Sequence, residues 1–211
     1  MQRTRIKLCG ITRLADALAA QDAGCDAVGF VFWHGSSRCI GVDDVTQIVQ
    51  KLSSMMTTVG VFVSPTPDEV LSTCQRAGLT AAQLCGDLPD GHWTDISKQV
   101  RLIRSVSSGH ASDRLDWTHD LLVDSHTDDQ PGGTGQTFDW SALSHGHDDS
   151  LRIWLAGGLH PGNVGEAVKR VHPFAVDVST GVEDRPGIKS HDKIGEFVAA
   201  VHAADLATQR D

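Results

Sequence analysis

The stretch Arg5–Thr12, RIKLCGIT, reads as a short apolar strand that ends at a glycine, and similar stretches recur along the chain. Amphipathic runs separate them, a pattern typical of βα units and a parallel sheet. Eight strands are expected, at residues 6–9, 27–32, 58–63, 81–85, 101–106, 121–125, 152–157 and 175–179. Eight units of roughly 26 residues favour a lean (β/α)8 TIM barrel. A doubly wound open sheet, which usually has about five or six strands, is the competing architecture.

The bulk composition predicts a cytoplasmic protein of one domain spanning residues 1–211. No apolar run is long enough to cross a bilayer, and no basic segment followed by an apolar core opens the chain, so we expect no membrane partner. The five cysteines include no C-x-x-C spacing, which predicts free thiols. A net charge of −9 argues against a nucleic-acid partner. Most of the histidines lie in polar connections, so no metal site is expected.

Polar residues end several of the expected strands, where the active site of a barrel lies. Lys7 and Cys9 share one strand face, which we expect to point into the barrel. Cys9 is either a reactive group or a small buried residue, which is the commoner use of a free thiol. Asp124 is either functional or a carboxylate capping the next turn. Because the last strand of a closed barrel neighbours the first, Lys7 is expected to pair with Asp177, or else to extend to solvent.

Glycines cluster after the last two expected strands, at 155–159 and 177–184. In barrels these two loops, with a short extra helix, commonly bind phosphate. Glycines let the backbone approach the phosphate, and free N–H groups donate to it. A third glycine cluster lies at 131–140.

The motifs together resemble the phosphoribosylanthranilate isomerase family along essentially the whole chain. The matching stretches are KLCGIT (7–12), GFVFWHGSSRCI (29–40), VGVFV (59–63), QLCGD (83–87), LLVDS (121–125), GGTGQTFDW (132–140), LAGGLHPGNV (155–164) and DVSTGVEDRPGIKS (177–190). The resemblance implies a barrel that performs an Amadori rearrangement of N-(5-phosphoribosyl)anthranilate in tryptophan biosynthesis, without metal or organic cofactor. The expected partner is this small-molecule substrate, with the chain a monomer or homodimer.

The resemblance also implies residue roles. Cys9 matches the family's general base and Asp124 its general acid, while Arg38 matches the arginine that holds the anthranilate carboxylate. The candidate substrate-binding residues are Arg38, Gly158, Asp177, Ser179, Thr180 and Gly181. Three positions depart from the family pattern: Ser37 stands where proline is usual, Cys85 replaces a usual histidine and Thr180 a common serine.

Acid and base must hold opposite protonation states, so we expect a raised pKa for Asp124 and a lowered one for Cys9, helped by Lys7. The substitution Gly181→Asp is expected to impair phosphate binding and to spare the fold. Two alternatives remain open at this point. One is another phosphosugar barrel, such as an epimerase or an indole-glycerol-phosphate synthase, and the other is a barrel that binds a phosphorylated metabolite without catalysis.

Overall fold

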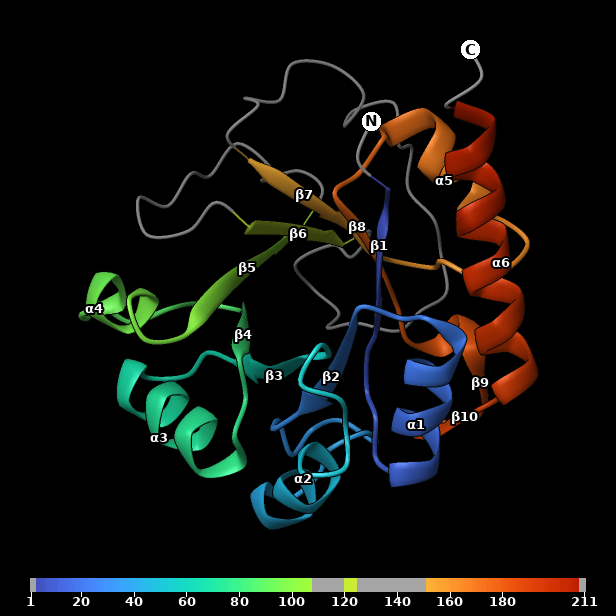
Figure 1. Ribbon diagram of the computed structural model, residues 1–211. Helices are drawn as coiled ribbons and strands as arrows, with labels where there is room; N and C mark the ends of the chain where they lie inside the picture. Colours follow the sequence, from blue (N-terminus) through green and yellow to red (C-terminus); the bar gives the residue numbers. More distant parts are fainter. Residues whose placement is uncertain (1–2, 108–119, 125–150, 209–211) are drawn as a thin grey trace.

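The computed structural model describes residues 3–107, 120–124 and 151–208, and it is a closed parallel barrel with helices around it (Figure 1). The strands follow one another around the barrel in chain order, and β8 closes it by pairing with β1. Their bounds are β1 Arg5–Leu8, β2 Ala27–Val31, β3 Thr57–Val63, β4 Ala81–Cys85, β5 Arg101–Ser107, β6 Asp120–Asp124, β7 Arg152–Leu155 and β8 Ala175–Val178. All eight expected strands are confirmed, with ends that differ by at most two residues.

The described helices lie outside the barrel: α1 Leu14–Ala23, α2 Val42–Val49, α3 Pro67–Ala77, α4 Trp93–Ser97, α5 Val164–Val171 and α6 His191–Thr208. Local sequence explains their ends. At α3, Thr66 and Glu69 form a capping box around Pro67, the first helical residue, and Gly78 ends the helix in the left-handed conformation. None of the described helices is long and apolar enough to cross a bilayer.

After β8 the chain forms a short 3-10 turn, η3 Thr180–Val182, and then a small antiparallel hairpin. The hairpin strands are β9 Glu183–Arg185 and β10 Ile188–Lys189, and they form a separate two-stranded sheet. The sequence indicated a short helix here but not the hairpin. Strands of two or three residues are too short to show an alternating pattern.

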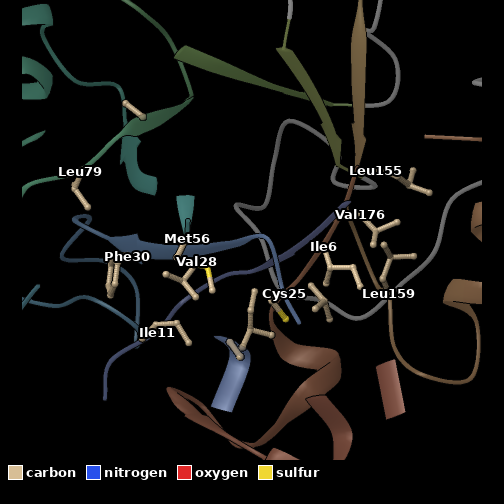
Figure 2. Packing of buried hydrophobic residues seen from close by; sticks show 14 of the residues in the cluster. Ile6, Ile11, Cys25, Val28, Phe30, Met56, Leu79, Leu155, Leu159 and Val176 are labelled. Atoms are coloured by element: carbon tan, nitrogen blue, oxygen red, sulfur yellow. The ribbon is translucent and has the colours of Figure 1, made fainter. Parts of the chain in front are cut away.

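Alternation along the strands separates two apolar layers. Ile6, Val28 and Val176, on adjacent strands, belong to the large cluster in which the barrel packs against the helices (Figure 2). Inward-facing residues form a second cluster, most of them nearer the amino ends of the strands: Ala27, Val59, Ala81, Ile103, Leu122, Trp154, Ala156 and Ala175. The barrel interior is therefore filled at this end.

Asp120, at the start of β6, ties neighbouring strands together at the amino end. Its carboxylate accepts hydrogen bonds from Arg101 Nε at 2.9 Å, from Arg152 Nε at 2.7 Å and from Trp154 Nε1 at 3.1 Å. These contacts lie at the end of the barrel that serves stability, opposite the carboxyl ends of the strands.

Candidate active site

Lys7 lies inside the barrel, above the apolar layer, as its strand face predicts. Its ammonium donates to Asp177 Oδ1 at 2.8 Å and to Gln83 Oε1 at 2.9 Å. The side chains of Lys7 and Asp177 are 1% and 9% exposed, so the expected ion pair is confirmed and is buried. Burial, the largest single effect, lowers the pKa of Lys7, but the charges and hydrogen bonds of Asp177 and Cys9 together outweigh it, and the pKa of Lys7 is raised.

Cys9 follows β1 directly, on the same face as Lys7 and nearer the mouth of the barrel. Its backbone N–H donates to the Val178 carbonyl at 2.8 Å, and its side chain packs with Val31 and Val61. Room for it comes from Gly29 on β2, where a Cβ would lie 3.1 Å from Cys9 Sγ and 3.2 Å from Lys7 Cε. A glycine inside a strand signals such a close approach, which makes Gly29 part of the site.

The expectation of a lowered pKa for Cys9 is wrong. Burial raises the pKa of this thiol, and the nearby charge of Asp177 adds to the rise. Lys7 and Lys189 act in the opposite direction without reversing it. The two lysines therefore limit the cost of forming a buried thiolate.

Asp124 is the last residue of β6 and is partly buried. It lies on the same strand face as Leu122, which belongs to the cluster inside the barrel, so the Asp124 carboxyl faces the interior. The pKa of Asp177 responds to it: burial raises that pKa, Lys7 opposes the rise, and the charge of Asp124 adds to it. Asp124 and the Lys7–Asp177 pair therefore share one electrostatic environment.

Arg38, in the loop after β2, reaches the neighbourhood of Cys9. A Cβ on Gly10 would lie only 2.5 Å from Arg38 Cδ, and Gly10 has a φ of +75°, so this position requires glycine. Glu183 accepts from Arg38 Nε at 2.8 Å and from Nη2 at 2.7 Å. Gly10 and Glu183 both lie in the quoted motifs, but the sequence alone does not mark either of them as part of the site.

The loops after β7 and β8 touch each other, as a shared phosphate site would require. Gly157 and Gly158 have φ values of +89° and +62°. Among the described residues, none accepts a recorded hydrogen bond from the backbone N–H groups of Gly158, Thr180 or Gly181. Gly158, Thr180 and Gly181 are among the residues that the family resemblance assigns to substrate binding.

Gly181 permits this contact between the two loops. A Cβ at Gly181 would lie 1.9 Å from the Leu159 carbonyl oxygen and 2.9 Å from His160 Cα. Both of those atoms are backbone, so no side-chain movement could relieve the clash. The expectation that Gly181→Asp spares the fold is therefore wrong, and the substitution cannot serve as a test of phosphate binding.

A second thiol, that of Cys85, lies at the mouth of the barrel. Cys85 ends β4, packs against the cluster that contains Cys9, and receives a long contact of 3.6 Å from Gln83 Nε2.

Within the described parts of the chain, no group of three or more His, Cys, Asp or Glu residues could hold a metal ion. The glycine cluster at 131–140 lies outside the described residues.

Comparisons with known proteins agree along the whole barrel. A family model described as N-(5'phosphoribosyl)anthranilate (PRA) isomerase matches residues 6–200. An N-(5'-phosphoribosyl)anthranilate isomerase from Magnetococcus marinus is 43% identical over 205 residues, covering 95% of this chain and 96% of the relative.

Solved structures give the same result. The crystal structure of phosphoribosyl anthranilate isomerase from Thermotoga maritima has a TM-score of 0.83 and 37% identity, covering 95% of this chain and 99% of that one. Another crystal structure contains phosphoribosyl anthranilate isomerase in complex with reduced 1-(o-carboxyphenylamino)-1-deoxyribulose 5-phosphate. Its TM-score is 0.82 at 36% identity, covering 95% of this chain and 99% of that chain.

Proposed function

The chain belongs to the N-(5'-phosphoribosyl)anthranilate isomerase family of tryptophan biosynthesis, and we propose that Cys9 is its general base and Asp124 its general acid. It is an isomerase, and its reaction is the Amadori rearrangement of N-(5-phosphoribosyl)anthranilate to 1-(2-carboxyphenylamino)-1-deoxyribulose 5-phosphate. The family match over residues 6–200 favours this isomerase over the three alternatives, an epimerase, an indole-glycerol-phosphate synthase and a non-catalytic binding barrel.

The reaction needs one proton donor and one proton acceptor. Asp124 gives a proton to the furanose ring oxygen, the C1–O bond breaks, and a cationic Schiff base forms at C1. Cys9, as thiolate, removes the C2 proton, and the electron pair of that C–H bond neutralises the Schiff base to give an enolamine. Tautomerisation of the enolamine yields the ketone at C2. Positioned acids and bases typically contribute about 10²- to 10⁴-fold each.

The observation that carries this proposal is the position of Cys9 above a buried lysine, on an interior that Asp124 also faces. Lys7 and Lys189 stabilise the negative charge of the thiolate, while burial opposes it. The cationic Schiff base makes the C2 proton acidic, so a thiolate suffices to remove it. The experiment is the turnover of Cys9 and Asp124 variants, described in the Discussion.

Arg38 would bind the anthranilate carboxylate. Replacing Arg38 with lysine keeps the charge but loses the planar fork, so we expect KM to rise about tenfold or more. Steady-state kinetics measure this change. The matched control is Arg76→Lys, at an exposed arginine paired with Asp43, which should leave KM unchanged. A wild-type KM in Arg38→Lys would show that Arg38 does not hold the carboxylate.

The phosphate would bind between the loops after β7 and β8, at Gly158, Ser179, Thr180 and Gly181. Since the chain carries a net charge of −9, attraction must come from local donors. Asp177 would belong to the same end of the site, and its buried ion pair with Lys7 supports a role in holding the site rather than in contacting the substrate.

Inorganic phosphate should compete with substrate for these loops. We expect Thr180→Asp, which adds a negative charge there, to raise the inhibition constant of phosphate and the KM of substrate by about tenfold or more. Thr94→Asp adds the same charge on α4 and serves as the control. Failure of phosphate to compete in the wild type, or normal binding in Thr180→Asp, would place the phosphate site elsewhere.

The remaining assignments follow the family and the composition. We assign residues 1–211 to one domain, acting in the cytoplasm as a monomer or homodimer on a small-molecule substrate, with no nucleic-acid or membrane partner. All five cysteines are free thiols, which supports a reducing compartment. The net charge of −9 supports the absence of a nucleic-acid partner.

A further inference from the structure

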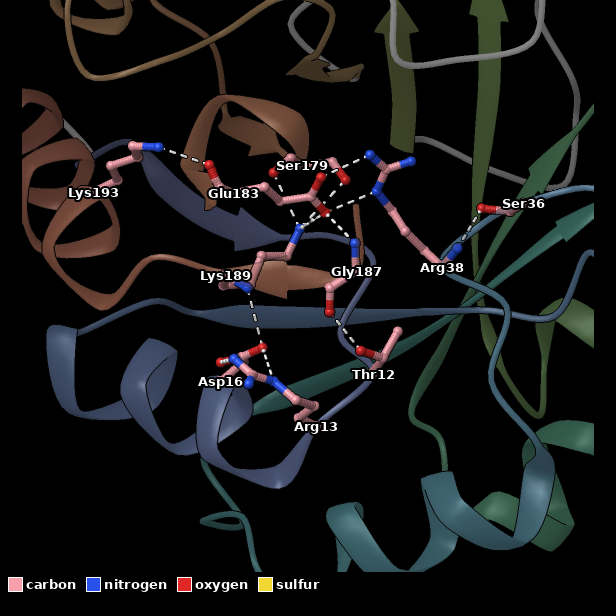
Figure 3. A network of polar contacts seen from close by, with 10 residues as sticks. All are labelled: Thr12, Arg13, Asp16, Ser36, Arg38, Ser179, Glu183, Gly187, Lys189 and Lys193. Carbon is pink, nitrogen blue, oxygen red and sulfur yellow. Dashed lines mark hydrogen bonds and ion pairs between the residues drawn. The ribbon is translucent and has the colours of Figure 1, made fainter. Parts of the chain in front are cut away.

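The Glu183 carboxylate stands at the centre of a polar network at the mouth of the barrel (Figure 3). It accepts two hydrogen bonds from Arg38, one from Lys189 Nζ at 2.9 Å, and one from the Gly187 backbone N–H at 3.3 Å. Its side chain is 5% exposed. A buried carboxylate with this many donors is fixed in both position and charge.

We propose that Glu183 is a positioning residue that aims the Arg38 guanidinium at the anthranilate carboxylate, an inference that rests on the proposed role of Arg38. The geometry of the fork carries it. Glu183 takes the edge formed by Nε and Nη2, so the other edge, formed by the two terminal nitrogens, faces away from Glu183. That edge can bind a second carboxylate with two parallel hydrogen bonds.

Arg38 requires such a partner because the hydrogen bond from its own loop holds its backbone and not its guanidinium. It lies between β2 and α2, and its backbone N–H donates to the nearby Ser36 hydroxyl at 3.1 Å. An arginine side chain has several rotatable bonds, and fixing them costs conformational entropy. The hydrogen bonds to Glu183 already fix the Arg38 side chain in the free enzyme, so substrate binding loses less free energy to ordering that side chain.

Glu183 is itself fixed by contacts with another part of the barrel. Thr12 Oγ1 donates to the Gly187 carbonyl at 2.6 Å, and the Lys189 N–H donates to Asp16 Oδ2 at 3.2 Å. The hairpin is thereby held against the β1–α1 connection and α1. Arg38 is thus oriented by a hairpin that is held by the β1–α1 connection and α1, and not by its own loop.

Lys189 links the hairpin to the phosphate end of the site. Its side chain is fully buried, and its ammonium donates to the Ser179 carbonyl at 3.1 Å as well as to Glu183. If Glu183 only supported the fold, replacing it would therefore weaken binding at both ends of the substrate site. A positioning role acts on the anthranilate end alone, and the two roles can be distinguished by inhibitors that each occupy one end.

The test uses anthranilate and inorganic phosphate as competitive inhibitors of the full-length enzyme. Glu183→Asp keeps a negative charge for Lys189 but is one methylene too short to hold both nitrogens of Arg38. Glu183→Gln keeps the shape and loses the charge. In both variants we expect the inhibition constant of anthranilate to rise about tenfold. In Glu183→Asp, which keeps the charge that Lys189 needs, the inhibition constant of phosphate should stay within about twofold of wild type.

Two further variants make the outcome decisive. Lys193→Met removes a contact of 2.7 Å to the Glu183 backbone carbonyl, leaves the carboxylate untouched, and should not change anthranilate inhibition. In an Arg38→Ala background, Glu183→Asp should have no further effect on anthranilate, because Glu183 acts through Arg38.

The contrary outcomes are distinct. If Arg38→Ala leaves anthranilate inhibition unchanged, the proposed role of Arg38 fails. If Arg38→Ala weakens anthranilate but both Glu183 variants resemble wild type, only the positioning role fails. Equal losses for anthranilate and phosphate in Glu183→Asp, or an undiminished Glu183→Asp effect in the Arg38→Ala background, would also overturn the positioning role.

Discussion

Replacing Cys9 with serine, or Asp124 with asparagine, is expected to lower kcat by about two to four orders of magnitude. A serine hydroxyl is far less acidic than a thiol and does not provide an anion near neutral pH. Asparagine occupies the space of Asp124 but has no proton to give to the ring oxygen. Both variants keep the shape of the site, so substrate affinity should change little. Steady-state turnover of N-(5-phosphoribosyl)anthranilate measures the loss.

Affinity is measured separately, with the reduced ribulose phosphate compound that is bound in a related isomerase. The matched control is Cys85→Ser, which alters another thiol in the cluster around Cys9. Since Cys85 has no proposed proton-transfer role, its kcat should stay close to wild type. A Cys9 or Asp124 variant with near wild-type kcat would remove that residue from the mechanism.

Replacing Lys7 with methionine is expected to lower the free energy of unfolding by about 3–5 kcal/mol, because it leaves Asp177 buried without its cation. The pair is 1% and 9% exposed, so water cannot replace the lost contact. Gln83 also loses its donor, at 2.9 Å. Equilibrium unfolding in urea measures the change, with circular dichroism and fluorescence as independent probes.

A double variant separates the ion pair from the barrel itself. Lys7→Met with Asp177→Leu removes both charges, and we expect it to recover much of the lost stability. Arg76→Met is the surface control, since its partner Asp43 is exposed and such pairs contribute less than about 1 kcal/mol. A Lys7→Met variant as stable as wild type would show that the buried pair does not support the fold.

The fold followed from the sequence because each strand carries its own signal. Alternation along β1 puts Ile6 against the helices and Lys7 inside, and a glycine or a polar residue lies at or just after the end of several strands. The positions of Cys9 and Asp124 at the mouth follow from the strand ends alone, because all parallel strands of a barrel open at one end. The Lys7–Asp177 pair follows from closure of the barrel.

The supporting contacts could not be read in the same way. Glu183 meets Arg38 across 145 residues of sequence, through a hairpin too short to show a period. The requirement for glycine at Gly181 comes from the Leu159 carbonyl on another loop. The direction of the Cys9 pKa depends on burial exceeding the effect of two lysines, and that balance depends on packing, which the sequence alone does not reveal.

The most direct test of the proposed mechanism is turnover by the purified protein in the presence of a chelator. N-(5-phosphoribosyl)anthranilate labelled with carbon-13 at C2 is incubated with wild-type enzyme and with the Cys9→Ser and Asp124→Asn variants. The mechanism predicts that the wild type converts the label to a ketone carbon in EDTA, while each variant forms it about 10²- to 10⁴-fold more slowly. No ketone from the wild type, or equal rates from all three proteins, would contradict it.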